Sequence, residues 1–246
     1  MNGQGPYPLN DTSLLRGTGT SAAGGTIMSE VYDRLRGEIL SCSLKPGQRI
    51  NINELAQRYE VSLSAVREAL SRLYSEQLVV LLPQRGYLVA SVSEEEFRQL
   101  TEARVEVEKS CLRHAILRGD VNWETRIVGA QYKMSRLPVR DPAKPEAVNP
   151  DWAKAHAEFH TMLAEACGNR WLMGVRHMLF EHSERYRRLI VPKQSQTRDI
   201  AGEHNAIAAA AIARDHVLAC DLLEEHLRKT ERDTLTERET DKVAIG

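Results

Sequence analysis

The chain has 246 residues, and its 33 lysine and arginine residues nearly balance 34 aspartate and glutamate residues, which gives a formal net charge of −1. This balance excludes a uniformly basic nucleic-acid-binding protein, although it is compatible with a local basic face. Hydrophobic residues make up 42% of the chain, as in ordinary globular proteins. No apolar run approaches the roughly 18 residues of a membrane span, so we expect no membrane partner.

The cysteines and the N-terminal sequence predict the cellular compartment. The four cysteines are Cys42, Cys111, Cys167 and Cys220, and no two of them are close in the sequence. A chain of this length does not need disulfides, so we interpret them as reduced core thiols. The N-terminus lacks the charged-then-apolar layout of a signal peptide. We therefore expect a cytoplasmic protein.

The first part of the chain predicts a tail followed by a helix. Residues 1–27 are rich in Gly, Ser and Thr, a composition that buries little surface and predicts a disordered N-terminal tail. Helical spacing then begins, and a Pro46-Gly47 turn ends the first helix. The apolar residues at this spacing are Val31, Leu35 and Ile39.

Two further helices and a hairpin follow. Asn51 or Asn53 can cap a second short helix, and Ser62 or Ser64 can cap a third. The third helix has inward-facing residues at Val66, Leu70 and Leu73. The stretch "LVVLLPQRGYLVASV" then predicts two short strands around a turn at Gln84-Arg85-Gly86.

After Val92 the pattern is helical throughout. Ser93 and Glu96 form a capping box at the start of the first of these helices. A proline-rich loop, "LPVRDPAKPEAVNPD", lies between the second and the third. The six helical patterns cover residues 94–118, 122–136, 151–167, 170–190, 198–213 and 215–237.

The chain is therefore predicted to be mainly α, with an N-terminal winged helix-turn-helix and a C-terminal all-helical bundle of about six helices. The boundary near residue 92 follows from the change from a mixed pattern to an all-helical one. The predicted divisions are a tail over 1–27, a winged helix-turn-helix over 28–92, a helical domain over 93–238 and a C-terminal tail over 239–246.

The start of the third helix predicts a DNA-binding face. Ser62, Ser64 and Arg67 lie on the side away from the core, where small hydroxyls and helix N-terminal amides suit phosphates and an arginine reaches a phosphate or a guanine. The alternative is a structural or protein-binding module, because serines at a helix start are often only caps. The eight basic and seven acidic residues between Ser29 and Val92 nearly balance. The charge of this region therefore does not decide between a DNA-binding module and a structural or protein-binding one.

The amino-acid motif of this region is more specific than its predicted order of helices and strands. The stretch "VYDRLRGEILSCSLKPGQRININELAQRYEVSLSAVREALSRLYSEQLV" closely resembles the DNA-binding domain of the GntR family of bacterial transcription regulators. The helical half resembles the FCD ligand-binding domain of the FadR-like branch. Leu63 stands where many members have arginine, Asn53 where some have a basic residue, and Gln77 where glycine is usual. The DNA-binding residues predicted from the resemblance are Ser62, Ser64, Ala65, Arg67, Arg72, Arg85 and Gly86.

Four of the eight histidines lie on helix faces that predict a common interior. His156 and His160 are four residues apart and so share a face, while His204 and His226 fall within apolar stripes of later helices. Imidazole is the commonest protein ligand for borderline divalent metals. The alternative is that each is a hydrogen-bonded core histidine.

The resemblance favours the metal. FCD domains commonly bind a metal through an aspartate, the histidine four residues later and two more histidines on later helices. His160, His204 and His226 match the histidines, and His156 occupies the aspartate position. An all-nitrogen site favours softer metals, so we expect a divalent transition metal, Zn or Ni, rather than Mn or Ca. The substitution could instead mean that the site is altered.

Arg104 interrupts the apolar stripe of the first helix in this half, and a buried charge needs an anionic partner. The partner is either a structural carboxylate such as Glu108 or the carboxylate of a small-molecule effector. Similar regulators place an arginine here for an effector.

These features predict a transcription regulator that acts as a repressor, rather than an enzyme. It would bind near-palindromic double-stranded DNA as a homodimer and respond to a small carboxylate bound beside the metal. The rival is a metalloenzyme or a metal-dependent binding scaffold built on the histidine cluster. Against the enzyme, the sequence has no "HExxH", nucleophile elbow or glycine-rich phosphate loop.

Overall fold

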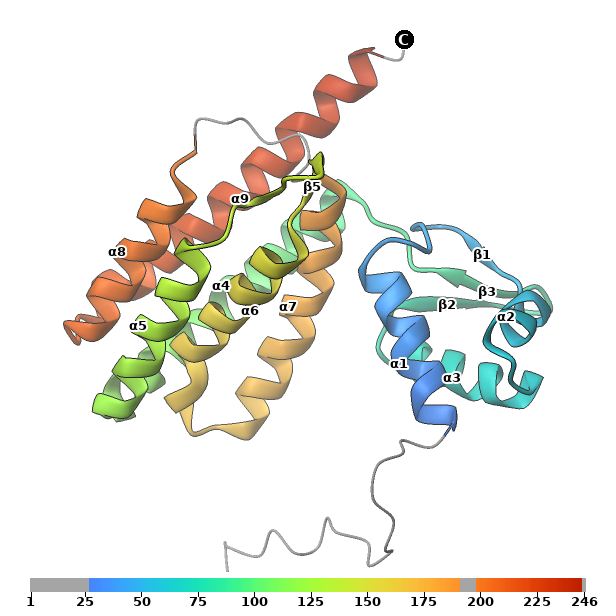
Figure 1. Ribbon diagram of the computed structural model, residues 1–246, viewed down its shortest axis with the longest axis horizontal. Helices are drawn as coiled ribbons and strands as arrows, with labels where there is room; N and C mark the ends of the chain where they lie inside the picture. The colour runs from blue at the N-terminus through green and yellow to red at the C-terminus, as the bar shows by residue number, and fades with distance from the viewer. Residues whose placement is uncertain (1–26, 191–197, 245–246) are drawn as a thin grey trace, which may run out of the picture.

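The computed structural model describes residues 27–190 and 198–244. In this part of the chain the structure has two units (Figure 1). A small unit contains α1 to α3 and a three-stranded sheet, and a larger unit contains the helices from α4 onward. The predicted mainly α fold, with a winged helix-turn-helix before a helical bundle, is confirmed.

The small unit packs three helices against a short sheet. Its helices are α1 (Ile27–Leu40), α2 (Ile52–Tyr59) and α3 (Leu63–Ser75), and its strands are β1 (Arg49–Ile50), β2 (Val79–Leu82) and β3 (Gly86–Val89). The antiparallel strands follow the order β1-β3-β2, and Val79 pairs with Val89. The apolar residues that set the helical spacing in the sequence, Leu35, Ile39, Val66, Leu70 and Leu73, are all fully buried.

The structure shows which residues cap α2 and α3, for each of which the sequence offered two candidates. Asn51 caps α2, since its side chain accepts hydrogen bonds from the amides of Asn53 and Glu54. Ser62 caps α3 by accepting from the amide of Ala65. Each cap satisfies amides that the helix itself leaves without a partner, so the first turns of α2 and α3 are both stabilised.

Two details of the small unit differ from the sequence analysis or extend it. Strand β1 was missed, because a strand of two residues has no period to detect; its residues Arg49 and Ile50 pair with β3. Gln77, which stands where the family has glycine, has a φ of 60°. The turn therefore keeps the left-handed backbone that glycine adopts without steric cost.

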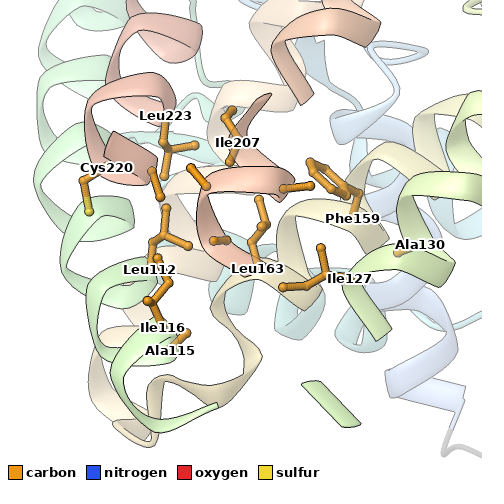
Figure 2. Close-up of a cluster of buried hydrophobic side chains, with 14 of the residues drawn as sticks. Leu112, Ala115, Ile116, Ile127, Ala130, Phe159, Leu163, Ile207, Cys220 and Leu223 are labelled. Atoms are coloured by element: carbon orange, nitrogen blue, oxygen red, sulfur yellow. The ribbon is translucent and has the colours of Figure 1, made fainter. Parts of the chain in front are cut away.

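The larger unit is a helical bundle. Its helices are α4 (Glu94–Arg118), α5 (Val121–Ser135), α6 (Pro150–Ala164), α7 (Arg170–Ile190), α8 (Ile200–Ile212) and α9 (His216–Ala244). Ser93 caps α4, as predicted. The core is an apolar cluster to which α4, α5, α6, α8 and α9 contribute, with Leu112, Ile127, Phe159, Ile207 and Leu223 among its residues (Figure 2).

Three features of this unit differ from the sequence analysis. The proline-rich loop contains a small hairpin of β4 (Arg140–Asp141) and β5 (Lys144–Val148). The end of the third helical pattern is a 3₁₀ turn, Glu165–Cys167. Helix α9 continues to Ala244, so part of the predicted C-terminal tail is helical. The predicted N-terminal tail lies outside the described residues apart from Ile27.

The two units meet where α7 contacts α1 and the end of α3. Arg36 on α1 bonds to Glu76 (2.9 Å) and forms an ion pair with Glu181 on α7. The imidazole Nε2 of His182 lies 2.9 Å from the carbonyl oxygen of Glu76. Helix α7 therefore connects the bundle to α1 and the end of α3 through polar contacts. None of the described helices is long and apolar enough to cross a bilayer.

Candidate functional site

The start of α3 presents a polar face to solvent. Ser62, Ser64 and Arg67 are all exposed, and the Ser62 and Ser64 hydroxyls lie 2.8 Å apart. The first turn contains no acidic residue, and Arg67 has no ion-pair partner among the described residues. A helix N-terminus with small hydroxyls and a free guanidinium suits a phosphate backbone and a guanine edge.

Two other predicted contact residues of α3 lie elsewhere. Ala65 is only 6% exposed and packs inside the unit, so only its backbone can contribute to a DNA contact. The Arg72 guanidinium lies 3.7 Å from the centroid of the Tyr32 ring on α1. Arg72 therefore stacks on the neighbouring helix rather than beside Arg67, because residues five apart in a helix differ by about 140° in direction.

The wing tip presents Arg85 to solvent at the β2–β3 turn. Gln84 and Gly86 have φ values of 59° and 87°, which is the left-handed geometry of this tight turn. The Arg49 guanidinium donates to the carbonyl oxygen of Arg85 at 2.8 Å. Arg49 could not be identified from the sequence, because its position beside the wing depends on the pairing of β1 with β3.

In the bundle, the four histidines predicted to converge do so. His156 and His160 come from α6, His204 from α8 and His226 from α9, and none is more than 6% exposed. One nitrogen from each lies within 4.8 Å of the others. The Nε2 atoms of His156 and His160 are 3.2 Å apart. Four convergent imidazole nitrogens at this separation could hold one transition-metal ion.

Burial keeps these imidazoles in the form that binds metals. Desolvation lowers the pKa of His160 well below its ordinary value, and the nearby His204, His226 and Arg104 lower it further. Desolvation also lowers the pKa of His226, although its hydrogen bond to Glu203 opposes the shift. Both rings are therefore neutral near pH 7, with lone pairs available for a cation.

A carboxylate orients one of the four rings. Glu203 Oε2 lies 2.8 Å from Nδ1 of His226, so the Nε2 atom of that ring is directed toward the cluster. Burial would raise the pKa of Glu203, but hydrogen bonds from His226, Arg198 and Lys229 outweigh it and hold the pKa below its ordinary value. Metal-binding histidines usually have such a partner on the second nitrogen.

Arg104 lies in the same cavity as the cluster. Its guanidinium donates to Ser183 Oγ at 2.8 Å and to Glu108 Oε1 at 3.1 Å. Glu108 also accepts from Arg176 at 2.7 Å, so one carboxylate serves two guanidinium groups. The Nε of Arg104 is buried and makes no hydrogen bond within the described part of the chain. Arg104 therefore has a structural carboxylate partner in Glu108, and its Nε–H group remains available to donate to an anion.

The cavity itself is small, at about 40 Å³, and is lined by His156, His160 and His226 together with Arg104 and Arg198. This volume accommodates a metal ion or a few water molecules. A second pocket of about 600 Å³ lies between the two units, and its wall shares Phe180 and Glu184 with the cavity. Space for a larger ligand therefore adjoins the histidines.

Comparison with known families matches both units. Residues 27–89 match the model described as "Bacterial regulatory proteins, gntR family", and residues 99–229 match the model of the FCD domain. The chain belongs to the GntR family. Members of this family with an FCD domain are transcription regulators, so this GntR-family protein is a DNA-binding transcription regulator and not an enzyme.

Individual relatives agree with this assignment. The chain is 35% identical over 205 residues to the uncharacterized HTH-type transcriptional regulator BphR of Paraburkholderia xenovorans, covering 83% of this chain and 84% of that one. It is 32% identical over 200 residues to the HTH-type transcriptional repressor GlaR of Escherichia coli, covering 80% and 90%. The fold resembles that of McbR/YncC from Escherichia coli, with a TM-score of 0.71, 17% identity and coverage of 87% and 100%.

The family also explains the interior cluster, because FCD domains commonly bind a metal. Two residues of this site were missed in the sequence. Arg198 and Glu203 lie near the start of α8, and their role depends on contacts with α9 that no local pattern reveals: Arg198 bonds to Thr230 (3.0 Å) and Asp233 (3.1 Å). In the sequence, the only indication of a role for Glu203 is its position directly before His204.

Proposed function

We propose that this regulator is a cytoplasmic repressor whose operator binding is controlled by a small organic acid bound beside a transition metal. In this proposal Ser62, Ser64, Arg67, Arg85 and Gly86 contact a near-palindromic operator, and the protein acts as a homodimer. The observation that carries the proposal is one cavity containing four convergent imidazoles and a guanidinium with an unused donor.

The donor set favours zinc or nickel. Four neutral imidazoles supply borderline nitrogen ligands and no negative charge, which disfavours hard cations such as Mg²⁺ or Ca²⁺. His156 replaces the carboxylate that would suit a harder ion. A bound metal would supply a positive centre for a carboxylate or hydroxyl of the effector.

Arg104 supplies the second positive centre. A carboxylate bound by the planar fork of its guanidinium would compete with Ser183, which lies on α7. The two residues before Ser183 on that helix, Glu181 and His182, contact α1 and the end of α3. An acid that displaces Ser183 would thereby change how α7 packs against the DNA-binding unit. This change would couple the effector site to the DNA-binding face.

Metal binding is tested on the purified protein. Elemental analysis should find close to one transition-metal ion per chain, and a chelator should lower the melting temperature, because a metal that binds only the folded state stabilises it. Added Zn or Ni should restore the melting temperature. Metal-free protein that does not respond to either ion would leave the four histidines as core residues.

Effector binding is tested by a thermal-shift screen of organic acids. Acids that bind should stabilise the wild type, Arg104→Ala should lose this response while retaining DNA binding, and Arg104→Lys should recover only part of it. Arg98→Ala changes an exposed arginine of the same helix and should respond like the wild type. Equal shifts for the wild type and Arg104→Ala would exclude this effector site.

DNA binding is tested by gel shift with the protein's own upstream promoter and with random duplex at low salt. Specific binding to the promoter that an effective acid weakens supports a repressor. Equal affinity for both duplexes would contradict a specific operator.

A further inference from the structure

A pocket of about 600 Å³ lies between α6, α7, β5 and the end of α1. This volume is in the range of small-molecule sites, whereas the histidine cavity, at about 40 Å³, holds only an ion or a few water molecules. The pocket can therefore accept an organic molecule that the histidine cavity cannot. The apolar residues of its wall are Leu40, Val148, Pro150, Ala153, Ala157 and Phe180, with Ala147 beside them.

Both units of the molecule contribute to this pocket. Leu40 and Ser41 come from the end of α1, and the other wall residues come from the bundle. Helix α7 lies on the side of the bundle that faces the DNA-binding unit (Figure 1). Its residue Glu181 lines the pocket and also forms an ion pair with Arg36 of α1. A molecule in the pocket would therefore contact both units, next to the ion pair that joins them.

The charged side chains that α7 brings to the wall are engaged elsewhere or lie at its inner side. Arg176 donates to Glu108 Oε2 at 2.7 Å. The imidazole Nε2 of His177 lies 3.3 Å from Glu181 Oε1. Glu184 is buried in the part of the wall that the pocket shares with the histidine cavity. A ligand that carries a charge must therefore find its partner on another element.

Lys154 of α6 supplies such a partner. It lines the pocket while remaining exposed, and it forms no ion pair or hydrogen bond within residues 27–190 and 198–244. Lys133 on α5, by comparison, bonds to Glu158 at 2.6 Å. An ammonium group beside an apolar wall attracts an anion more strongly than one surrounded by water. The pocket thus combines one available positive charge with a large apolar surface.

We propose that this pocket is a second ligand site, which takes an organic anion with a large apolar body and holds the DNA-binding unit against α7. The apolar body would lie on Val148, Ala153 and Ala157, and the acidic group would bind Lys154. The site is additional to the proposed function, because it requires neither a metal nor Arg104. A ligand that contacts both units stabilises the arrangement in which they lie together.

The probe for this site is anilinonaphthalenesulfonate, an anion with an apolar body whose fluorescence rises in apolar surroundings. We expect saturable binding, and competition by straight-chain carboxylates that strengthens about fourfold per methylene from butanoate to octanoate. Lys154→Met should weaken octanoate about two- to fivefold, as for loss of an exposed ion pair, and leave octanol unchanged. Lys133→Met is the matched control and should behave like the wild type. Equal competition by butanoate and octanoate would overturn the proposal.

Two filling substitutions locate the ligand. Ala157→Phe narrows the pocket from α6 and Ser41→Phe from the end of α1, so each should lose most of the probe binding with an unchanged circular dichroism spectrum. Unchanged probe binding in either folded variant would contradict a site between the units.

Arg104→Ala distinguishes this site from the one beside the histidines and should bind octanoate like the wild type. Loss of octanoate binding in this variant would overturn the second site, because it would assign the anion to the histidine cavity. The proposed function would survive that result, since it depends on Arg104 rather than on Lys154.

Discussion

Arg67 and Arg72 lie five residues apart on α3 but have different surroundings. Arg67 is exposed and has no ion-pair partner within residues 27–190 and 198–244, on the face that carries Ser62 and Ser64, whereas Arg72 stacks on Tyr32 of α1. The first guanidinium is available to DNA and the second supports the packing of α3 on α1 through its charge and its ring contact. We therefore expect Arg67 to contribute more to DNA recognition and Arg72 more to the packing of the unit.

Arg67→Ala should weaken specific operator binding by about 1–3 kcal/mol if the guanidinium contacts a base. Arg72→Ala is the control, and we expect it to lower the melting temperature slightly with less effect on specificity. A gel-shift titration at two salt concentrations measures both. Unchanged affinity and an unchanged salt slope for Arg67→Ala would contradict docking of α3 in the major groove.

Glu203 is the residue that orients His226. Glu203→Gln keeps the size of the side chain but removes the negatively charged carboxylate that faces Nδ1 of His226. We expect metal affinity to fall roughly 10- to 100-fold, which is typical for loss of such a partner. Competition with a chromophoric chelator measures the affinity. The control Glu158→Gln removes an exposed partner of Lys133 and should leave it unchanged; equal losses for the two variants would remove the special role of Glu203.

At the scale of elements, the α4–α5 connection has no room for a side chain at its glycine. Gly119 ends α4, and a Cβ added there would lie 2.2 Å from the Trp123 ring. Trp123 is fully buried in the main core, so the ring cannot move away. The requirement here is space rather than backbone freedom, because the φ of Gly119 is −60°.

Gly119→Ala should therefore destabilise the protein by about 1–3 kcal/mol, the usual cost of overpacking a core. Gly37→Ala is the matched control, since no atom lies within 4 Å of the added Cβ on α1; it should stabilise by about 0.5–1 kcal/mol through helix propensity. Urea unfolding distinguishes the two. A Gly119→Ala protein as stable as the wild type would mean that α5 shifts to make room.

The sequence was most informative where a period runs for several turns. Helix α4 was predicted at its observed bounds, and the convergence of the four histidines followed from their places on apolar stripes. Strands β1 and β4 escaped prediction because each has two residues, and β5 because the prolines in and around it suggested a loop. The contacts of Arg198 depend on which helices become neighbours. The contact of Arg72 with Tyr32 could not be predicted, because the two residues are 40 positions apart in the sequence.

For the whole molecule, the contact between α7 and the DNA-binding unit is polar and contains His182. Burial lowers the pKa of His182 from its ordinary value of about 6.5, and its Nε2 donates to the Glu76 carbonyl. The unfolded chain therefore takes up a proton near pH 6.5 while the folded chain does so only at lower pH. Stability should fall as the pH falls below about 6.5.

His182→Gln removes the titrating group but retains a donor for the Glu76 carbonyl. Between pH 7.5 and 5.5, the wild type should lose stability relative to this variant, by at most about 1.4 kcal/mol per pH unit for one proton. Urea unfolding across this range measures the difference. His160 and His226 titrate in both proteins and cancel in the comparison. Parallel stability curves for the two proteins would show that His182 is not coupled to folding.

The stacking of Trp152 on His156, with ring centroids 4.8 Å apart, gives the histidine cluster an optical reporter. A bound paramagnetic ion such as Ni²⁺ quenches the emission of a nearby indole, so the fluorescence of Trp152 should fall as Ni²⁺ fills the site, whereas diamagnetic Zn²⁺ should not quench it in this way. The other two indoles are separable from it. Trp171 is 74% exposed and open to aqueous iodide, whereas Trp123 is fully buried in the apolar core, away from the imidazoles that would change its lifetime.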